Sequence, residues 1–420
     1  MGLVVAIAVA GGLALTPLAR RLAWKAGAVS RPDGKRKRHA QPTAAWGGVA
    51  VLLALVAGIA VSWARHPAEA GATRWYMALA ASAASLCLLG CYDDLVDLRA
   101  RWKLLGQIVS ILPLVLSGHY VENLAVAGYT IHLGPWGAAW TIVWLVLGIN
   151  ALNLIDGMDG LASVIGILTS VNIAVISTSF GLAHVALAAM ALAGALLGFV
   201  VYNLPPARIY LGDCGSMVIG LLLGVLALEA SPEPATANAT IIAGALFVPL
   251  FDTALAVIRR TIRGQGIMVA DRGHIHHRLL DRGFSIWAVL GILGVFCLVS
   301  GAAAWLAAVE GQELAAWAVL LIGTAWCVVG RLAGHEEWAL VVALFRQGMG
   351  AAPFDSRSPS AAAGRSGPPA VANFRAGGDR QATARISAGV GRALVGARRT
   401  RPQTPHSARV KKHGFVESLS

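Results

Sequence analysis

Residues 150–162, NALNLIDGMDGLA, separate two long apolar runs and constrain how the chain can fold. The flanking runs, 136–149 and 161–178, contain no charged residue, whereas the junction contains two asparagines and two aspartates. With their polar edges included, at 136–152 and 161–180, the runs are long enough to cross about 30 Å of hydrocarbon as helices. The junction therefore predicts a polar hinge between two membrane spans, rather than an interruption within one buried helix.

The composition favours lipid over water for most of the chain. Of the 420 residues, 57% are hydrophobic and 13% are charged, and the mean hydropathy is +0.67. A soluble protein carries about 25% charged residues. The five cysteines show no zinc-ligand or secreted-disulfide spacing, so we expect reduced thiols with a packing role. The first run, 3–19, lacks a basic n-region and a small-residue cleavage site, so we interpret it as a membrane span rather than a signal peptide.

Apolar runs of about 17–22 residues recur along the chain, long enough to span a bilayer as helices. They predict an all-α, polytopic integral membrane protein with about eleven transmembrane helices. The fourth run is short, and only Gly181 separates the sixth from the seventh. The predicted spans are 3–19, 46–64, 75–92, 104–117, 136–152, 161–180, 182–202, 215–230, 239–258, 286–306 and 313–333.

Positive charge falls on one side of these predicted spans. Lysines and arginines concentrate in the loops after odd-numbered spans, whereas the loops after even-numbered spans contain only Arg65 and Arg74. Cytoplasmic loops of membrane proteins carry such an excess of Lys and Arg. We therefore expect the N-terminus outside and the C-terminus in the cytoplasm. The net charge of +13 then reflects orientation and a basic tail, so we expect no nucleic-acid partner.

The composition changes near residue 350. Gly, Ala, Ser, Pro and Arg dominate residues 350–420, and large apolar side chains are few there. Such a segment cannot bury a core. We predict a membrane-embedded domain over residues 1–340 and a disordered basic cytoplasmic tail over 350–420, which either contacts anionic lipid headgroups or stays solvated without a fixed role.

Acidic residues gather at the predicted cytoplasmic ends of the spans, and the outside loops hold no comparable polar motif. A purely structural arrangement would scatter carboxylates over both faces. The acids on the predicted cytoplasmic side are Asp93, Asp94, Asp97, Asp156, Asp159, Asp213, Asp271 and Asp281. Their convergence favours chemistry at one membrane surface.

Two of these acidic motifs suit a divalent cation. Asp93 and Asp97 would share a helix face at i, i+4 if the third helix continued, and neighbouring carboxylates repel unless a cation lies beside them. The following basic residues could also neutralise them in part; these are Arg99, Arg101 and Lys103. In IDGMDG, glycines let the backbone approach a ligand beside Asp156 and Asp159, and Mg²⁺ is usually held by one or two carboxylates plus substrate phosphates. A solvated helix end and a plain polar turn are the alternative explanations.

Three further features are candidates for ligand contacts. Asp213, between glycines and just before an apolar run, lies where helix N–H groups favour a phosphate, but it could equally cap the helix. The HIHH cluster is flanked by Arg272 and Arg278, which suits phosphate oxygens better than a cation. Asp252 lies inside the ninth predicted span, where an ionisable residue either marks a functional site or bonds to a neighbouring helix.

Together these motifs resemble one family, the polyprenyl-phosphate N-acetylhexosamine-1-phosphate transferases of glycosyltransferase family 4, which includes phospho-MurNAc-pentapeptide transferase. The resemblance covers roughly residues 1–340. DDLVDL and HIHH are similar to the GlcNAc-1-phosphate branch, whereas the peptidoglycan branch typically has Lys where Asp97 stands. The loop before Gly47 departs from the family pattern, because Ala and Trp replace a frequent Pro-Arg or Pro-Met. The matching pieces are K-x-H-x-x-P-T before Gly47-Gly48, DDLVDL…KLLGQ, NALNLIDGMDGLA, PARIYLGDCGS, FDT and HIHHRLLDRG.

The resemblance implies transfer of GlcNAc-1-phosphate from a UDP-N-acetylhexosamine to undecaprenyl or another polyprenyl phosphate, with release of UMP. The lipid-linked product would initiate a cell-envelope polysaccharide. The implied setting is the bacterial inner (plasma) membrane, with the active site on the cytoplasmic face. The resemblance also implies Mg²⁺, with Mn²⁺ as a substitute, and we expect a homodimer.

The resemblance also implies roles for individual residues. Asp213 and Asp156 would hold the metal, and the catalytic group would comprise Asp93, Asp94, Asp156 and Asp159. The implied substrate-binding residues are Asn153, Asn203, Asp252, Arg272, His274, His276, His277 and Arg278.

Other functions remain as alternatives at this stage. Within the family, the alternative is the phospho-MurNAc-pentapeptide transferase of peptidoglycan synthesis. A polytopic transporter would place ionisable residues near the bilayer midplane, often in repeated halves. Here only Asp252 is predicted to lie deep, and the sequence shows no repeat. An intramembrane metalloprotease is weaker still, because the sequence contains no HExxH motif.

Overall fold

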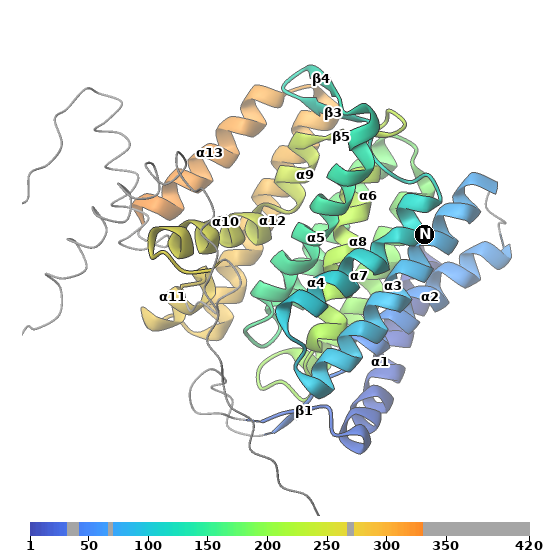
Figure 1. Ribbon diagram of the computed structural model, residues 1–420, viewed down its shortest axis with the longest axis vertical. Coiled ribbons are helices and arrows are strands. Elements are labelled where there is room, and N and C mark those ends of the chain that lie inside the picture. Colours follow the sequence, from blue (N-terminus) through green and yellow to red (C-terminus); the bar gives the residue numbers. More distant parts are fainter. Residues whose placement is uncertain (32–41, 66–69, 267–272, 331–420) are drawn as a thin grey trace, which may run out of the picture. The chain divides into compact units, whose positions relative to one another are not determined.

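The structure, a computed structural model, describes residues 1–31, 42–65, 70–266 and 273–330 (Figure 1). Apart from the last two residues of α10, the elements discussed below belong to the larger of two compact units. Helices dominate this unit, because a helix satisfies its own backbone hydrogen bonds in lipid. The helices are α1 (Gly2–Ala26), α2 (Gly47–Arg65), α3 (Ala70–Val96), α4 (Ala100–Leu116), α5 (Gly137–Ile155), α6 (Leu161–Ser179), α7 (Ala183–Asn203), α8 (Gly212–Glu229), α9 (Ala239–Ala245), α10 (Phe247–Ile262), α11 (Ile275–Asp281), α12 (Ile286–Glu310) and α13 (Glu313–Val329).

The chain is a mostly helical, polytopic membrane protein. Among the described residues, eight helices are long and apolar enough to cross a membrane, or nine if the bent pair α9–α10 counts as one span. The predicted count of about eleven is therefore not confirmed, although each predicted run does contain a helix. Helices α4 and α13 contain 17 residues each, which is about 25 Å of helix against about 30 Å of hydrocarbon. The predicted domain of residues 1–340 and the tail over 350–420 stay predictions, because residues 331–420 lie outside the described part.

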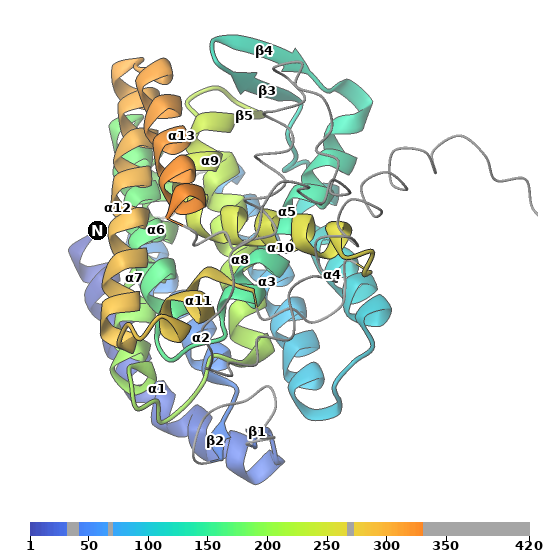
Figure 2. The same ribbon diagram turned by 90° about the vertical axis from the view of Figure 1, so that its left-hand side faces the viewer.

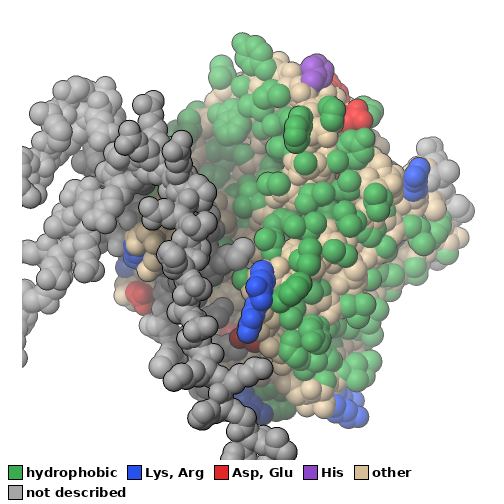
Figure 3. Space-filling model, in the orientation of Figure 1, with side chains coloured by type: hydrophobic (Ala, Val, Ile, Leu, Met, Phe, Trp, Pro, Cys, Tyr) green, Lys and Arg blue, Asp and Glu red, His purple; other side chains and the backbone are tan. Residues whose placement is uncertain are grey.

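The surface of the helices agrees with a lipid environment. On the face that Figure 3 shows, hydrophobic side chains cover most of the described helices, and charged side chains are few. Large apolar residues such as Leu88, Leu116 and Val143 are more than two-thirds exposed. Such exposure would be costly in water over so wide an area, and in a bilayer it is favourable.

Helix α8 lies at the centre of the bundle (Figure 1). It packs against α2, α3, α5 and α6, and every residue from Cys214 to Leu228 is buried. A helix that is apolar on all sides is expected to occupy a core. Its N-terminus approaches α2 so closely that a Cβ atom on Gly48 would collide with the backbone of Gly215. The glycine pair Gly47-Gly48 is thus required for close helix packing.

Two small sheets lie at opposite ends of the helices (Figure 2). At one end β1 (Val29–Ser30) pairs antiparallel with β2 (Thr43–Ala44). At the other end, β3 (Asn123–Val126) lies between β4 (Tyr129–His132) and β5 (Thr236–Asn238), antiparallel to β4 and parallel to β5. The β3–β4 turn, Ala127-Gly128, has positive φ at both residues, as a tight two-residue hairpin requires.

The ninth predicted span, 239–258, is not one straight helix. Helices α9 and α10 meet at an angle of 85°, and Figure 2 shows α10 lying across the direction of α12. Pro249 explains the break, because it has no N–H to donate to the carbonyl of Ala245 four residues earlier. The hydroxyl of Thr169 on α6 donates to that carbonyl instead, at 3.1 Å. A neighbouring side chain therefore satisfies the backbone group that the proline leaves free.

We predict that Thr169→Val destabilises the protein, because the buried carbonyl of Ala245 would lose its donor. The expected loss is about 1–3 kcal/mol in the free energy of unfolding. It can be measured as a lower midpoint of thermal unfolding, followed by tryptophan fluorescence in detergent. The matched control is Thr178→Val, because Thr178 only adds a bond to a carbonyl within its own helix. Equal midpoints for both variants would contradict the account of the bend.

Candidate active site

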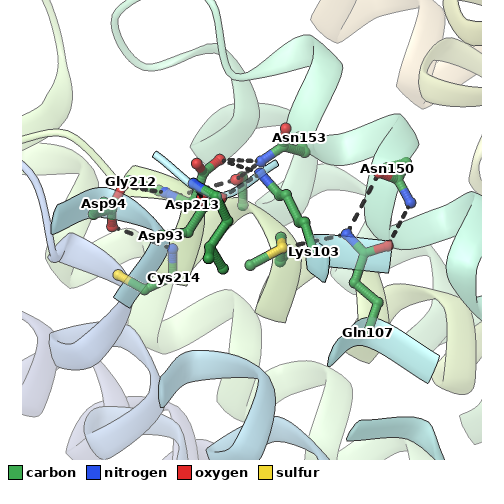
Figure 4. Close-up of polar contacts among 12 residues, drawn as sticks. Asp93, Asp94, Lys103, Gln107, Asn150, Asn153, Gly212, Asp213 and Cys214 are labelled. Atoms are coloured by element: carbon green, nitrogen blue, oxygen red, sulfur yellow. Dashed lines mark hydrogen bonds and ion pairs between the residues drawn. The ribbon is translucent and has the colours of Figure 1, made fainter. Parts of the chain in front are cut away.

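Polar residues from four helices meet at the end of the bundle where β1 and β2 lie (Figures 2 and 4). Asp93 and Asp94 come from the last turn of α3, and Asp213 comes from the first turn of α8. Lys103 lies in the first turn of α4, and Asn153 in the last turn of α5. The sequence predicted the meeting of the α3, α5 and α8 ends, and the structure adds the start of α4.

Lys103 joins two aspartates that are far apart in the sequence. Its Nζ lies 2.8 Å from Oδ2 of Asp93 and 3.1 Å from Oδ1 of Asp213. Oδ1 of Asp93 accepts a hydrogen bond from the backbone N–H of Leu98 at 2.7 Å. Asp93 is 5% exposed, so its charge depends on the ammonium group beside it.

Asp94 caps the buried helix α8 from a neighbouring helix. Its Oδ1 accepts from the N–H of Asp213 at 2.9 Å, and its Oδ2 accepts from the N–H of Cys214 at 3.4 Å. The first N–H groups of a helix have no partner within it, and a carboxylate there also interacts favourably with the helix dipole. Gly212 permits this approach, because a Cβ atom on it would lie 2.5 Å from Oδ2 of Asp94. The cap accounts for the position of Asp94, and its predicted catalytic role stays a prediction.

The two asparagines of NALNLIDGMDGLA hold neighbouring helices (Figure 4). The amide of Asn153 donates to Oδ1 of Asp213 and, at 3.0 Å, to the hydroxyl of Ser216. Asn150 exchanges hydrogen bonds with the side chain of Gln107 on α4, at 2.8 and 3.4 Å. The end of α5 is thus tied to α8 and to α4.

The two aspartates of this stretch have different surroundings. Oδ2 of Asp159 accepts from the N–H of Ala207 at 2.9 Å and so anchors the loop after α7. The side chain of Asp156 accepts no hydrogen bond from any described residue. Burial, together with the negative charges of Asp213, Asp94 and Asp159, raises the pKa of Asp156 to about 8. Asp156 is therefore the carboxylate of the pair that is available to a ligand.

The HIHH segment is held in place by Asp252. Oδ2 of Asp252 lies 2.8 Å from Nδ1 of His274, and its Oδ1 accepts from the N–H of Ile275 at 2.9 Å. Asp252 lies in α10, and these contacts are with the N-cap and the first residue of α11. The structure thus records a bond to a neighbouring helix, one of the two explanations offered from the sequence. The predicted substrate-binding role of Asp252 stays a prediction.

His276 connects the two loops of the site. A Cβ atom on Gly157 would lie 2.8 Å from Nε2 of His276, so IDGMDG and HIHH are in direct contact. Nε2 of His276 is buried and has no hydrogen-bond partner among the described residues. Burial, followed by the neighbouring charge of His277, lowers the pKa of His276 to about 3. A neutral imidazole with a free nitrogen therefore faces the same region as Asp156.

Several predicted positions have other outcomes. Asp97 does not share a helix face with Asp93: α3 ends at Val96, and Asp97 is exposed with φ of 53°. The shared face required the third helix to continue, and it does not, because the chain turns sharply to begin α4. Asn203 is buried; its amide oxygen accepts from Ser163, and its nitrogen donates to the carbonyl of Ile209. Its side chain thus stabilises a loop, and a substrate contact stays a prediction.

Of the remaining predicted residues, His277 and Arg278 belong to the short helix α11, and each makes a further interaction. Arg272 and Asp271 lie outside the described residues. Sequence reasoning did not single out Lys103 or Gln107. The signal for Lys103 was its place in a basic run after an acidic pair, but nothing in that run distinguishes it from Arg99 or Arg101.

The chain is similar to known proteins over most of its helical part. Residues 76–231 match the family described as glycosyl transferase family 4. A protein of Bacillus subtilis named "Probable undecaprenyl-phosphate N-acetylglucosaminyl 1-phosphate transferase" is 34% identical over 276 residues, which cover 65% of this chain and 75% of that protein. The chain therefore belongs to glycosyl transferase family 4.

Two further relatives show the range of this family. The decaprenyl-phosphate N-acetylglucosaminephosphotransferase of Mycolicibacterium smegmatis is 33% identical over 297 residues, covering 63% of this chain and 72% of that protein. The phospho-N-acetylmuramoyl-pentapeptide-transferase of Levilactobacillus brevis is 28% identical over 274 residues, covering 61% and 81%. The chain is thus an enzyme of the type that transfers a sugar phosphate to a lipid phosphate.

Members of this family are generally metal-dependent. No three His, Cys, Asp or Glu side chains of the described residues form a finished metal site. Asp156 has no competing hydrogen bond, and the side chain of Asp213 is 33% exposed. Mg²⁺ usually takes one or two carboxylates, several waters and the phosphates of a substrate. Asp156 and Asp213 therefore fit a cation site that the substrate completes.

We predict that Lys103→Gln lowers activity by about 100-fold or more. The substitution removes the charge that Asp93 and Asp213 share, and an uncompensated buried carboxylate costs about 3–5 kcal/mol. Steady-state transfer of labelled sugar phosphate to lipid measures the effect. The control is Arg99→Gln, since Arg99 is exposed at the start of the same helix. Similar losses of activity in both variants would show that activity depends on positive charge in general, and not on the ion pairs of Lys103 with Asp93 and Asp213.

We also predict that Gly157→Ala lowers activity roughly tenfold, because the added methyl group would displace His276. Overpacking of this kind costs about 1–3 kcal/mol. Gly291→Ala in α12 is the control, since a Cβ atom there meets nothing within 4 Å. The same transfer assay applies, with thermal unfolding to check that both variants fold. Full activity of Gly157→Ala would refute the proposed contact between the two loops.

Proposed function

We propose that this protein transfers GlcNAc-1-phosphate from UDP-GlcNAc to a polyprenyl phosphate and releases UMP. The observation that carries the proposal is the set of carboxylates, Lys103 and His276 at one end of a membrane-embedded helix bundle. Relatives named as undecaprenyl- and decaprenyl-phosphate N-acetylglucosamine-phosphate transferases support it. The product, a lipid-linked sugar diphosphate, would begin a cell-envelope polysaccharide.

The chemistry that we propose is a displacement at phosphorus. A phosphate oxygen of the lipid attacks the phosphorus that bears the sugar, and the bond from that phosphorus to the bridging oxygen breaks. UMP leaves with the bridging oxygen and its electron pair. A phosphate monoester has a second pKa near 6, so at neutral pH the lipid phosphate already carries the charge needed to attack. Positioning and offset of negative charge then dominate catalysis, and a general base contributes little.

The residues of the site suit the positioning of the phosphates and the offset of their negative charge. We propose that Asp156 and Asp213 hold the divalent cation, which when bound would neutralise charge on the phosphate oxygens. Lys103 keeps the neighbouring carboxylates in place. His276 offers its unpartnered nitrogen to the donor, and His274 orients that loop through Asp252.

The finer setting is also part of the proposal. We place the active site at the cytoplasmic face of a bacterial plasma membrane, because Lys and Arg concentrate in the loops at that end. The cation is proposed to be Mg²⁺, with Mn²⁺ as a substitute, since oxygen ligands suit both. A homodimer stays a prediction from the resemblance.

One experiment tests the proposal and its family alternative together. Purified protein with Mg²⁺ and undecaprenyl phosphate receives labelled UDP-GlcNAc or UDP-MurNAc-pentapeptide in parallel reactions. We expect lipid-linked product only from UDP-GlcNAc, its loss in EDTA, and its loss in Asp213→Asn. The control Asp97→Asn should keep activity, because Asp97 lies exposed outside the site. Product only from the MurNAc donor would reverse the assignment, and near-wild-type turnover of Asp213→Asn would reject its role at the metal.

A further inference from the structure

A cationic hollow lies between α1 and the loop that follows α7. Its volume is about 160 Å³, and it is separate from the group of Asp93, Lys103 and Asp213. It lies at the same end of the bundle, because it is formed by the last part of α1 and the C-terminal end of α7. The lining residues are Thr16, Pro17, Arg20, Arg21, Tyr202 and Arg208.

The wall of this hollow is built around a proline. Pro17 lies within α1 and has no N–H for the carbonyl of Leu13. The hydroxyl of Tyr202 on α7 donates to that carbonyl at 3.2 Å. Close contact also fixes the two helices, because a Cβ atom on Gly198 would collide with the backbone of α1. Tyr202 and the arginines of α1 therefore keep a defined relative position.

The loop that carries the third arginine, Arg208, is hydrogen-bonded to α7 and to Asp159 of the active-site region. The backbone N–H of Arg208 donates to the carbonyl of Tyr202 at 2.8 Å. The preceding residue, Ala207, donates to the carboxylate of Asp159 at 2.9 Å. Its loop is further secured by Asn203, which donates to the carbonyl of Ile209. The position of Arg208 is thus set by two segments of the fold rather than by its own side chain.

The charges in the hollow are not offset within the described chain. Across residues 1–31, 42–65, 70–266 and 273–330, none of the three guanidinium groups pairs with a carboxylate. All three arginines are exposed, so they are accessible to a ligand, and their positive charges add up over one small volume. The planar guanidinium group matches phosphate oxygens in geometry and charge. An anion with several oxygens is therefore the ligand that this lining suits.

The surroundings indicate that the anion belongs to an amphiphile. Leu18 and Leu22 on the same part of α1 are 50% and 48% exposed, and acyl chains would cover them. Positive charge that serves only to orient a membrane protein can lie anywhere in the cytoplasmic loops. It does not explain why arginines from α1 and from the loop after α7 line the same hollow. We propose that this hollow binds the phosphate of an anionic phospholipid headgroup, at a site separate from the catalytic centre.

Native mass spectrometry of the full chain in detergent tests this site without relying on transferase activity. The probes are phosphatidylglycerol, phosphatidylcholine and inorganic phosphate. We expect the wild type to retain phosphatidylglycerol over phosphatidylcholine. The triple variant Arg20→Gln, Arg21→Gln and Arg208→Gln should lose this retention by about tenfold or more, since it removes every charged donor that lines the hollow. Lys25→Gln, an exposed charge in the last turn of α1, is the matched control and should bind as the wild type does.

Two further results complete the test. If the triple variant does not fold, the single variants Arg21→Gln and Arg208→Gln should each weaken retention, with thermal unfolding as the check on folding. Equal retention of phosphatidylglycerol by folded variants and wild type would overturn the site. Binding of inorganic phosphate but not of phosphatidylglycerol would contradict the proposal that the bound phosphate belongs to a lipid. Loss of retention in the Lys25 control as well would reduce the effect to general surface charge and overturn the proposal.

Discussion

The structure depends on the satisfaction of backbone groups at the N-terminus of α8. The helix is buried from Cys214 onward, and its first N–H groups have no partner within the helix. Asp94 on α3 accepts from two of them. That single cap brings the end of α3 to the start of α8, and it thereby places Asp93 and Asp213 on either side of Lys103.

The same constraint applies at the two prolines near the sites. Pro17 and Pro249 each leave a carbonyl without its helical donor, and a hydroxyl from a neighbouring helix supplies the missing bond. Pro17 lies in the wall of the arginine hollow, within the continuous helix α1. At Pro249 the chain bends, and α10 is turned so that Asp252 reaches His274. Local departures from helical geometry are thus stabilised by contacts between helices, and they position the polar residues.

Charge is distributed unevenly within the active site. Asp93 and Asp94 are occupied by Lys103 and by the end of α8, and Asp159 is occupied by a loop. Asp156 accepts no hydrogen bond from the described residues, and the nearby carboxylate of Asp213 is partly exposed. We therefore propose that the acids divide between structural and ligand-binding roles. A cation and the phosphates of the substrate complete what the protein leaves unneutralised.

The sequence by itself determined the membrane setting, the helical class and the set of motifs at one end of the bundle. Apolar length and the position of charged residues are local properties, and they are enough for those conclusions. It also predicted that NALNLIDGMDGLA is a hinge, and the structure confirms that α5 ends at Ile155 and α6 begins at Leu161.

Only the tertiary structure decided which polar residues form hydrogen bonds and ion pairs with one another. It selected Lys103 from three neighbouring basic residues, assigned Asp159 to a loop, and left Asp156 free for a ligand. It also replaced a straight ninth span with a bend at Pro249, and it ended α3 before Asp97. The pairings of Lys103 and Asp159 depend on ion pairs and hydrogen bonds between residues that lie tens to more than a hundred positions apart, and no local periodicity records such contacts.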